Sequence, residues 1–308
     1  MMIESISILL IGLALLLIGS NLLVTSTDNA SKRFSISGFY ASFFMIGLAT
    51  SAPEIFISIE SALQNKTILA IGNALGSNIS NIALVFCISL FFVKDGLIEK
   101  NLPIRPYMSM ILLTFSCFIL MFFDGSLDAK DSLILIVLLI VCVYYFQPTE
   151  HKKTTDSKGS AGLSSIIVYL LMSLGMLIYG STYFISGATQ IATALGVSAY
   201  VIGLTLAALG TSLPELAASI QSARKGKFDF IVGNIIGSNL FNIAIAMSFA
   251  GIINSSYIDT SDLTRDILML GLSMLVLYLI IQSNSMFRTV YSAALVITYF
   301  LYLTLIFE

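Results

Sequence analysis

Ten apolar runs, each long enough to cross a lipid bilayer, dominate this chain of 308 residues. A helix rises about 1.5 Å per residue and the hydrocarbon core is about 30 Å thick, so roughly 20 apolar residues span it. Only 10% of the residues are charged, whereas a soluble domain carries about 25%. We therefore expect an all-α membrane protein with ten transmembrane helices. The expected spans are 5–26, 37–63, 67–93, 106–123, 131–147, 163–187, 197–223, 228–252, 266–282 and 289–306.

The basic residues are distributed unevenly between the loops that these spans define. If the N-terminus lies outside, twelve of the fifteen Lys and Arg residues fall in inner loops, and only Lys66, Lys130 and Arg265 fall in outer loops. Inner loops of membrane proteins carry most of the Lys and Arg. We therefore expect a multi-pass protein of the plasma membrane with both termini outside and a cytoplasmic linker at 147–162. The only histidine, His151, lies in this linker and is expected to be solvated.

The chain repeats itself at an offset of 161 residues. The repeated strings are GLATSAPE and ALGTSLPE, at 47–54 and 208–215, and GNALGSNISN and GNIIGSNLFN, at 72–81 and 233–242. Each half contains five expected spans, and because five is odd the second half must enter the membrane from the opposite face. We therefore expect two inverted five-helix repeats, at 1–146 and 163–308. This architecture is typical of secondary transporters, whose site lies at the repeat interface near the membrane midplane.

Glu54 and Glu215 are the only carboxylates that we expect deep within the spans. A charged side chain at the bilayer centre costs about 2.5–3.5 kcal/mol on insertion scales. No Lys or Arg is expected at a comparable depth, so a bound cation or a proton must offset the charge. Glu60 and Asp229 lie near span ends, where water reaches them, and are expected to be interfacial.

Neutral oxygen atoms accompany each glutamate. Pro53 and Pro214 lack an N–H group and crowd the carbonyl of the preceding turn, so carbonyls near them should be free to face a ligand. The candidate side chains are Thr50, Ser51, Thr211 and Ser212 beside the glutamates, and Asn73, Ser77, Asn81, Asn234, Ser238 and Asn242 at four-residue spacing on the following spans. With no sulfur or imidazole among them, these ligands predict a site for a hard cation such as Ca²⁺ or Na⁺.

Some of these polar residues have simpler interpretations. Ser, Thr and Asn within spans often only form hydrogen bonds between helices, and Asn73, Asn78 and Ser80 are open to that interpretation. Paired acids could also serve an intramembrane hydrolase. The chain has neither an HExxH motif nor a histidine within a span, so we do not expect an enzyme. It also has no GxxxxGK[ST] loop that would bind ATP.

Small residues within the spans are expected to serve packing. Glycine permits close approach of helix backbones in membranes, and a cysteine in an apolar run is usually a packing residue. The glycines beside the polar stripes are Gly72, Gly76, Gly233 and Gly237, and the cysteines are Cys87, Cys117 and Cys142.

The strings GLATSAPEIFIS and ALGTSLPELAAS, each followed by GNxxGSNxxN, resemble the two alpha-repeats of the cation/calcium exchanger superfamily. The resemblance covers essentially the whole chain and is strongest to compact prokaryotic sodium/calcium exchangers. It implies a secondary active antiporter that exchanges Na⁺ for Ca²⁺ by alternating access, with the first and sixth spans sliding as a pair against the rest. The implied ligands are the carboxylates of Glu54 and Glu215, carbonyls of Gly47, Thr50, Ala208 and Thr211, hydroxyls of Ser51, Ser77, Ser212 and Ser238, and the symmetric amides Asn81 and Asn242.

One position departs from part of this superfamily. Some members have an aspartate where this chain has Asn242, so the site would hold two acids and not three. This difference disfavours potassium co-transport and proton coupling through that position. Exchange of H⁺ or another cation for Ca²⁺ remains the alternative to Na⁺/Ca²⁺ exchange. We expect the protein to function as a monomer in the bilayer, with Ca²⁺ and Na⁺ as substrates and with neither a cofactor nor a nucleic-acid partner.

Overall fold

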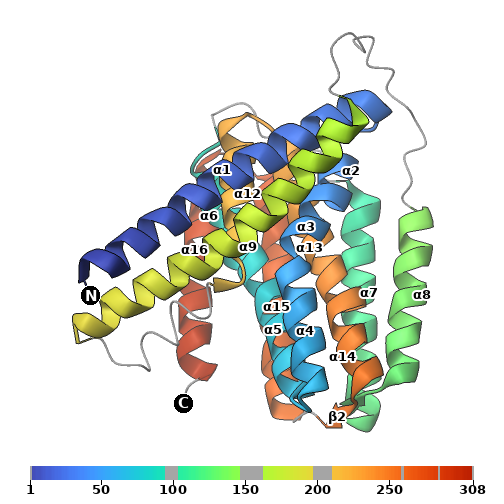
Figure 1. Ribbon diagram of the computed structural model, residues 1–308. Helices are drawn as coiled ribbons and strands as arrows, with labels where there is room; N and C mark the ends of the chain where they lie inside the picture. The colour runs from blue at the N-terminus through green and yellow to red at the C-terminus, as the bar shows by residue number, and fades with distance from the viewer. Residues whose placement is uncertain are drawn as a thin grey trace.

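The computed structural model describes residues 2–93, 103–145, 162–196, 210–257, 260–283 and 285–306, and nearly all of them are helical. Figure 1 shows most helices packed side by side in one bundle. Two longer helices, α1 (Met2–Phe34) and α9 (Leu163–Ala194), lie antiparallel against each other and cross the bundle obliquely. The expected linker lies outside the described residues except for Gly162, so the interpretation of His151 is not tested.

Small residues bring α1 and α9 into close contact. A Cβ atom added to Gly12 would lie 2.3 Å from the backbone nitrogen of Phe184, and one added to Gly187 would lie 2.6 Å from that of Leu9. These distances leave no room for a side chain, so glycine lets the two backbones approach as small residues do in other membrane helix pairs. The two helices therefore form one tightly packed unit.

The second expected span is not one continuous helix. It consists of α2 (Gly38–Ser42), a π-helical turn η1 (Phe43–Gly47), α3 (Leu48–Thr50) and α4 (Ala52–Leu63). The chain bends by 41° between Thr50 and Ala52, because Pro53 cannot donate the hydrogen bond that would continue the helix. In the second half, α12 (Leu213–Arg224) also begins with a proline, Pro214. The residues before it, 197–209, lie outside the described part of the chain.

The spans that follow each of these prolines contain π-helical turns. The first runs from α5 (Thr67–Ser80) through η2 (Asn81–Phe86) to α6 (Cys87–Leu90), and the second from α13 (Phe228–Phe241) through η4 (Asn242–Met247) to α14 (Ser248–Ile253). Both π turns begin at the last Asn of a repeated string. Single π turns within α-helices are frequent at functional sites, so these two asparagines are of interest for the site.

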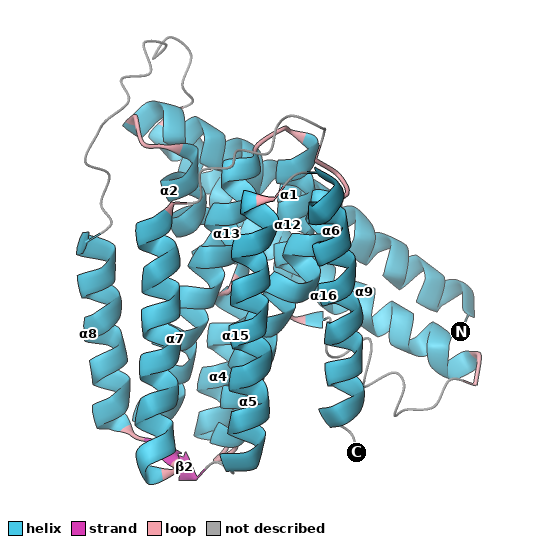
Figure 2. Ribbon diagram, turned by 180° about the vertical axis from the view of Figure 1, so that it is seen from behind, coloured by secondary structure: helices cyan, strands magenta, loops and turns pink. Residues whose placement is uncertain are grey.

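Four further helices complete the bundle, and Figure 2 shows three of them, α7, α15 and α16, on the side opposite to α1 and α9. Their bounds are α7 (Ile104–Asp124), α8 (Ala129–Tyr145), α15 (Thr260–Gln282) and α16 (Ser285–Ile306). Two short strands, β1 (Ser126–Leu127) and β2 (Ser256–Tyr257), pair antiparallel and tie the α7–α8 connection to the segment before α15.

The first turn of α8 is capped by Asp128. Its carboxylate accepts hydrogen bonds from the backbone N–H groups of Asp131, at 3.0 Å, and Lys130, at 2.7 Å. These bonds favour the ionised form and hold the pKa of Asp128 below its usual range. The cap satisfies helix donors that would otherwise lack partners.

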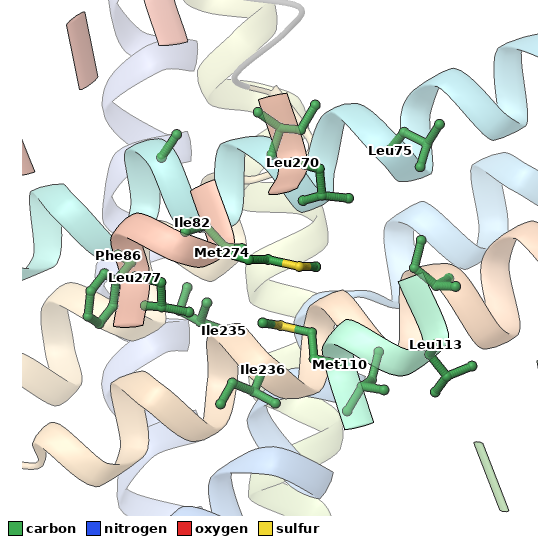
Figure 3. Packing of buried hydrophobic residues seen from close by; sticks show 14 of the residues in the cluster. Leu75, Ile82, Phe86, Met110, Leu113, Ile235, Ile236, Leu270, Met274 and Leu277 are labelled. Atoms are coloured by element: carbon green, nitrogen blue, oxygen red, sulfur yellow. The ribbon is translucent and has the colours of Figure 1, made fainter. Parts of the chain in front are cut away.

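The apolar core lies between α5, α7, α13 and α15 (Figure 3). The labelled core residues are Leu75, Ile82, Phe86, Met110, Leu113, Ile235, Ile236, Leu270, Met274 and Leu277. The three cysteines are free and buried within the same cluster. They are therefore packing residues, which confirms the prediction.

Seven helical segments in the described part are long and apolar enough to cross a membrane, and the bent segment from α2 to α4 would make eight. The other two expected spans are α8, which has 17 residues, and 197–223, most of which lies outside the described part. Three helices extend beyond the expected spans: α1 ends at Phe34 and its span at 26, α9 ends at Ala194 and its span at 187, and α15 begins at Thr260 and its span at 266. Hydropathy marks only the apolar part of a helix, whereas the backbone stays helical through its polar ends.

Candidate ion-binding site

Glu54 and Glu215 are both completely buried, with 0% of each residue exposed. Each lies in the first turn of its helix, α4 or α12, directly after a proline. Asn234 links the two segments, because its Oδ1 accepts from Thr50 Oγ1 at 3.1 Å and its Nδ2 donates to the backbone oxygen of Glu215 at 3.4 Å. Among the ion pairs of the described residues, none joins a Lys or Arg to either glutamate. The fold therefore places two acids in one buried region without a basic partner.

None of the four carboxylate oxygens accepts a hydrogen bond from a described residue. The hydroxyl of Ser77 lies beside Glu54 and that of Thr50 lies beside Glu215. An unsatisfied buried polar group costs about 1–3 kcal/mol, and a charged group costs more. All four oxygens are thus available to a positively charged ligand.

Hydroxyl groups from the two halves of the chain meet beside the glutamates. Thr50 Oγ1 lies 3.3 Å from Ser238 Oγ, and Ser77 Oγ lies 3.3 Å from Thr211 Oγ1. Each of these contacts is converted into the other by the offset of 161 residues. The threonine before the proline in each half, Thr50 or Thr211, therefore contacts the serine on α13 or α5 of the other half. Ser212, next to Thr211, contributes a further contact, from its Oγ to Ser80 Oγ at 2.6 Å.

Asn78 and Asn239 join α5 to α13 through a reciprocal pair of hydrogen bonds. Asn78 Nδ2 donates to the backbone oxygen of Asn239 at 3.1 Å, and Asn239 Nδ2 donates to that of Asn78 at 3.2 Å. The two residues are also 161 positions apart. Asn78 therefore has the interhelical hydrogen bond that the simpler interpretation allowed. The pairing with Asn239 was not predicted, although the common position of both residues in the repeated GSN string was a usable signal.

Asn81 and Asn242, which begin the two π turns, are also fully buried. Asn81 Nδ2 donates to Asn239 Oδ1 at 3.2 Å, while its own Oδ1 accepts no hydrogen bond from the described residues. Neither amide atom of Asn242 has a hydrogen-bond partner there. Two amide oxygens, Asn81 Oδ1 and Asn242 Oδ1, therefore remain for a cation.

Three other predicted ligands differ in their surroundings. The carbonyl of Gly47 already accepts hydrogen bonds from Ser51 N at 3.1 Å and Ser238 Oγ at 3.2 Å. The hydroxyl of Ser51 is buried and has no hydrogen bond within the described residues. Ala208 lies outside the described part of the chain. The structure thus gives no position for one of the predicted carbonyls.

The polar residues on α5 and α13 are not bonded equally. Asn234 Nδ2 donates to Ser219 Oγ at 3.0 Å, and Asn234 Oδ1 accepts from Thr50 Oγ1 at 3.1 Å. At the equivalent positions, Asn73 Nδ2 and Ser58 Oγ make no hydrogen bond in the part of the chain that the structure describes. Asn234 is therefore fully bonded, whereas groups at the equivalent positions of the first half are not.

The glycines on α13 lie against the backbone of α2 and η1. A Cβ atom on Gly233 would lie 2.5 Å from the Phe39 carbonyl oxygen, and one on Gly237 would lie 2.6 Å from that of Phe43. These distances confirm the predicted close approach. A Cβ atom on Gly72 or Gly76 would meet no described atom within 4 Å. The segment equivalent to α2 and η1, at 199–208, lies outside the described residues.

Comparison with known proteins identifies the family. A model of the sodium/calcium exchanger protein family matches residues 4–147 and 165–308. The chain belongs to the sodium/calcium exchanger protein family. Its two matched segments coincide closely with the two predicted repeats, so the sequence resemblance is confirmed.

Relatives of this exchanger-family chain match most of its length. The sodium/calcium exchanger MaX1 of Methanosarcina acetivorans is 25% identical over 287 residues, covering 80% of this chain and 82% of that protein. The inner membrane protein YrbG of Escherichia coli is 29% identical over 276 residues, covering 84% and 83%. A solved structure of a sodium/calcium exchanger from Methanococcus jannaschii matches with a TM-score of 0.81 at 27% identity over 99% of both chains. The chain is thus a multi-pass membrane protein of a family of cation exchangers, which are transporters and not enzymes.

Proposed function

We propose that this protein exchanges Na⁺ for Ca²⁺ across the membrane at a site between Glu54 and Glu215. The observation that carries the proposal is the burial of both carboxylates without a basic partner or a hydrogen bond among the described residues. Their combined charge matches that of one Ca²⁺, and oxygen ligands suit both Ca²⁺ and Na⁺. The exchangers from Methanosarcina acetivorans and Methanococcus jannaschii, which are named for these two ions, support the choice.

Neutral oxygens would complete the coordination of either ion. The proposed ligand set is Glu54 and Glu215, the carbonyls of Gly47, Thr50, Ala208 and Thr211, the hydroxyls of Ser51, Ser77, Ser212 and Ser238, and the amides of Asn81 and Asn242. The contacts of Thr50 with Ser238 and of Ser77 with Thr211 support this set, because they bring both halves of the chain to the glutamates.

Exchange follows from the cost of buried charge. With cations bound, the two carboxylates are neutralised and the carrier can reorient. With no cation bound, two negative charges would have to cross the hydrocarbon region, and this step is strongly disfavoured. After releasing one ion species the carrier therefore has to bind the other before it can reorient, because its conformational equilibrium depends on what is bound. The electrochemical gradients of the two ions set the direction of net transport.

The same proposal includes the architecture and the placement in the membrane. The halves 1–146 and 163–308 would be inverted repeats with ten spans in total, joined by the cytoplasmic linker 147–162. The antiparallel course of α1 and α9 and the reciprocal bonds of Asn78 and Asn239 support the inversion. Both termini would lie outside the plasma membrane, and the monomer would be sufficient for transport.

Sodium is preferred to protons as the counter-ion because the site contains neutral amides at both 81 and 242. Two acids are then available to one Ca²⁺, and no third carboxylate is present at these positions to carry a proton. Ion exchange with H⁺ is the outcome that the transport experiment must separate from exchange with Na⁺.

Uptake of ⁴⁵Ca²⁺ into proteoliposomes tests the proposal. Vesicles loaded with Na⁺, K⁺, Li⁺ or choline are diluted into Na⁺-free buffer, with ionophores present to collapse the proton gradient and the membrane potential. Rapid uptake is expected only in the Na⁺-loaded vesicles. Uptake that requires a proton gradient and ignores Na⁺ would favour H⁺/Ca²⁺ exchange, and the absence of uptake under every gradient would reject Ca²⁺ transport.

Site variants link the flux to the carboxylates. Glu54→Gln and Glu215→Gln are each expected to reduce uptake to the level of protein-free vesicles, because one Ca²⁺ would keep only one acidic ligand. Glu60→Gln is the matched control, since Glu60 lies on the same helix but is exposed. Uptake by this control should equal that of the unmodified protein.

A further inference from the structure

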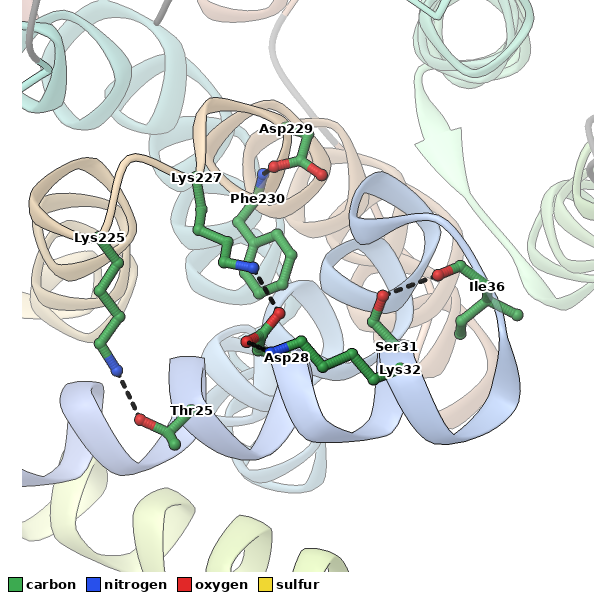
Figure 4. Close-up of polar contacts among 9 residues, drawn as sticks. All are labelled: Thr25, Asp28, Ser31, Lys32, Ile36, Lys225, Lys227, Asp229 and Phe230. Carbon is green, nitrogen blue, oxygen red and sulfur yellow. Dashed lines mark hydrogen bonds and ion pairs between the residues drawn. The ribbon is translucent and has the colours of Figure 1, made fainter. Parts of the chain in front are cut away.

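A row of polar contacts joins α1 to α12 and to the loop that follows it. Gln221 Nε2 donates to Asn21 Oδ1 at 2.8 Å, and Lys225 Nζ donates to Thr25 Oγ1. Figure 4 shows the end of this row, where Lys227 forms an ion pair with Asp28. These contacts connect the helix pair α1–α9 to the helix that carries Glu215.

The three contacts are arranged along one face of α1. Asn21, Thr25 and Asp28 are spaced by four and three residues, so their side chains project from the same side of the helix. Asp28 is held from two directions, because Lys32 Nζ also lies 2.8 Å from its carboxylate. Lys227 is in turn held above the ring of Phe230, 5.1 Å from its centroid. The ion pair is therefore part of an ordered cluster and not an isolated surface contact.

The other end of the molecule offers a direct comparison. An offset of 161 relates Gln221, Lys225 and Lys227 to Glu60, Gln64 and Lys66 at the end of α4. These three residues are exposed and bond to one another: Gln64 Nε2 donates to Glu60 Oε1 and Lys66 Nζ donates to Gln64 Oε1, both at 3.3 Å.

The equivalent side of α9 is likewise not joined to α4. The residues that correspond to Asn21, Thr25 and Asp28 are Thr182, Ser186 and Thr189. Thr182 Oγ1 donates to Ile178 O within its own helix at 2.9 Å, and Ser186 Oγ accepts from Gln190 Nε2 of the same helix. No hydrogen bond between described residues joins α9 to α4. Among the described residues, hydrogen bonds and ion pairs between polar side chains therefore fasten the helix pair to α12 and its following loop but not to α4.

We propose that Asn21, Thr25 and Asp28, with Gln221, Lys225 and Lys227, form a latch that closes the cytoplasmic side of the ion site in this conformation. The latch rests on the proposed function, in which the α1–α9 pair slides against the rest of the protein. Because the glycine contacts fix α1 to α9, movement of the pair has to separate α1 from α12. The latch must open once in each transport cycle, and it biases the resting population toward the conformation open to the outside.

Reversible crosslinking tests whether α1 and α12 must separate. Asn21→Cys and Gln221→Cys are introduced together and joined with a short bis-methanethiosulfonate reagent. The matched control joins Ser5→Cys on α1 to Gln190→Cys on α9, whose native side chains are bonded at 2.8 Å. Crosslinking at 21 and 221 is expected to stop ⁴⁵Ca²⁺ uptake until a reductant is added, whereas crosslinking at 5 and 190 should leave uptake unchanged. Full transport by the protein crosslinked at 21 and 221 would overturn the latch.

The reduced samples separate failure of the latch from failure of the proposed function, because they report Ca²⁺ uptake without the crosslink. A second measurement does not depend on transport. Asp28→Ala or Lys227→Gln is expected to slow crosslinking between positions 21 and 221 several-fold, and to leave crosslinking between 5 and 190 unchanged. Lys66→Gln, at the equivalent position on the other side, should alter neither rate. Equal crosslinking rates at 21 and 221 with and without Asp28 would also overturn the latch.

Discussion

The side-chain amides of Asn78 and Asn239 each donate a hydrogen bond to the backbone carbonyl of the other residue, at 3.1 and 3.2 Å. Both residues are fully buried, and they occupy equivalent positions in the two repeated strings. If a two-fold rotation exchanges the two halves, Asn78 takes the place of Asn239 and the pair of hydrogen bonds is unchanged. The pair is therefore consistent with a two-fold axis between α5 and α13, and it supports the proposed relation between the repeats.

Removing this pair should destabilise the protein. Asn78→Ala and Asn239→Ala each leave a buried carbonyl without its donor, which costs about 1–3 kcal/mol. Because the two side chains act on one interface, the double variant is expected to lose less than the sum of the single losses. Thermal unfolding in detergent measures all three. Thr304→Ala, which alters an exposed residue bonded within α16, is the control. Single losses no larger than that of the control would contradict the prediction.

Calcium should stabilise the protein through the two glutamates. A ligand at 100 times its Kd adds about 2.7 kcal/mol to the free energy of unfolding, so Ca²⁺ should raise the Tm of the unmodified protein. In Glu54→Gln this increase should be absent, while the Tm without Ca²⁺ should rise, because a buried charge next to Glu215 is removed. Glu60→Gln should retain the full Ca²⁺ effect. If Ca²⁺ raised the Tm of Glu54→Gln as much as that of the unmodified protein, the Glu54 carboxylate would be excluded as a ligand.

Asn242→Leu separates a ligand role from a packing role. The buried amide has no hydrogen bond within the described residues, so an apolar side chain of similar size removes an unsatisfied group that costs about 1–3 kcal/mol. The variant is therefore expected to unfold at a higher temperature without ions and to take up Ca²⁺ more slowly. Unchanged uptake together with the higher Tm would show that the amide does not bind the ion.

Gly237→Ala should destabilise the protein. A Cβ atom at 237 would lie 2.6 Å from the carbonyl oxygen of Phe43. Overpacking of this kind costs about 1–3 kcal/mol. Thermal unfolding should therefore show a lower Tm for Gly237→Ala. Thr304→Ala, which alters an exposed residue bonded within α16, is the control, and a Tm of Gly237→Ala equal to that of the control would contradict the prediction.

Much of the fold and part of the site could be predicted from the repeated strings. The apolar runs gave the helices of the bundle, and the shared offset drew attention to Glu54 and Glu215. Two prolines at equivalent positions predicted interruptions, and the bend before Pro53 agrees with this. These features depend on local sequence: an apolar run forms a helix and a proline interrupts it whatever the segment packs against.

Other features depend on contacts between segments distant in sequence. The π turns that begin at Asn81 and Asn242 were not predicted, because nothing in the local sequence distinguishes them from ordinary α-helix. The unequal hydrogen bonding of Asn73 and Asn234 was also not predicted, since an exact repeat predicts equal surroundings. Only a conformation that treats the two ends of the molecule differently can separate such equivalent residues.

The placement of Glu54 and Glu215 in the first turns of α4 and α12 has a consequence for ion release. The amino end of a helix carries a partial positive charge of about half an elementary charge. Two such ends meet the acids, and their fields oppose part of the attraction between the carboxylates and a divalent ion. In the proposed exchange cycle, the helix dipoles would thus moderate how tightly Ca²⁺ is held, so that the ion could leave on the far side.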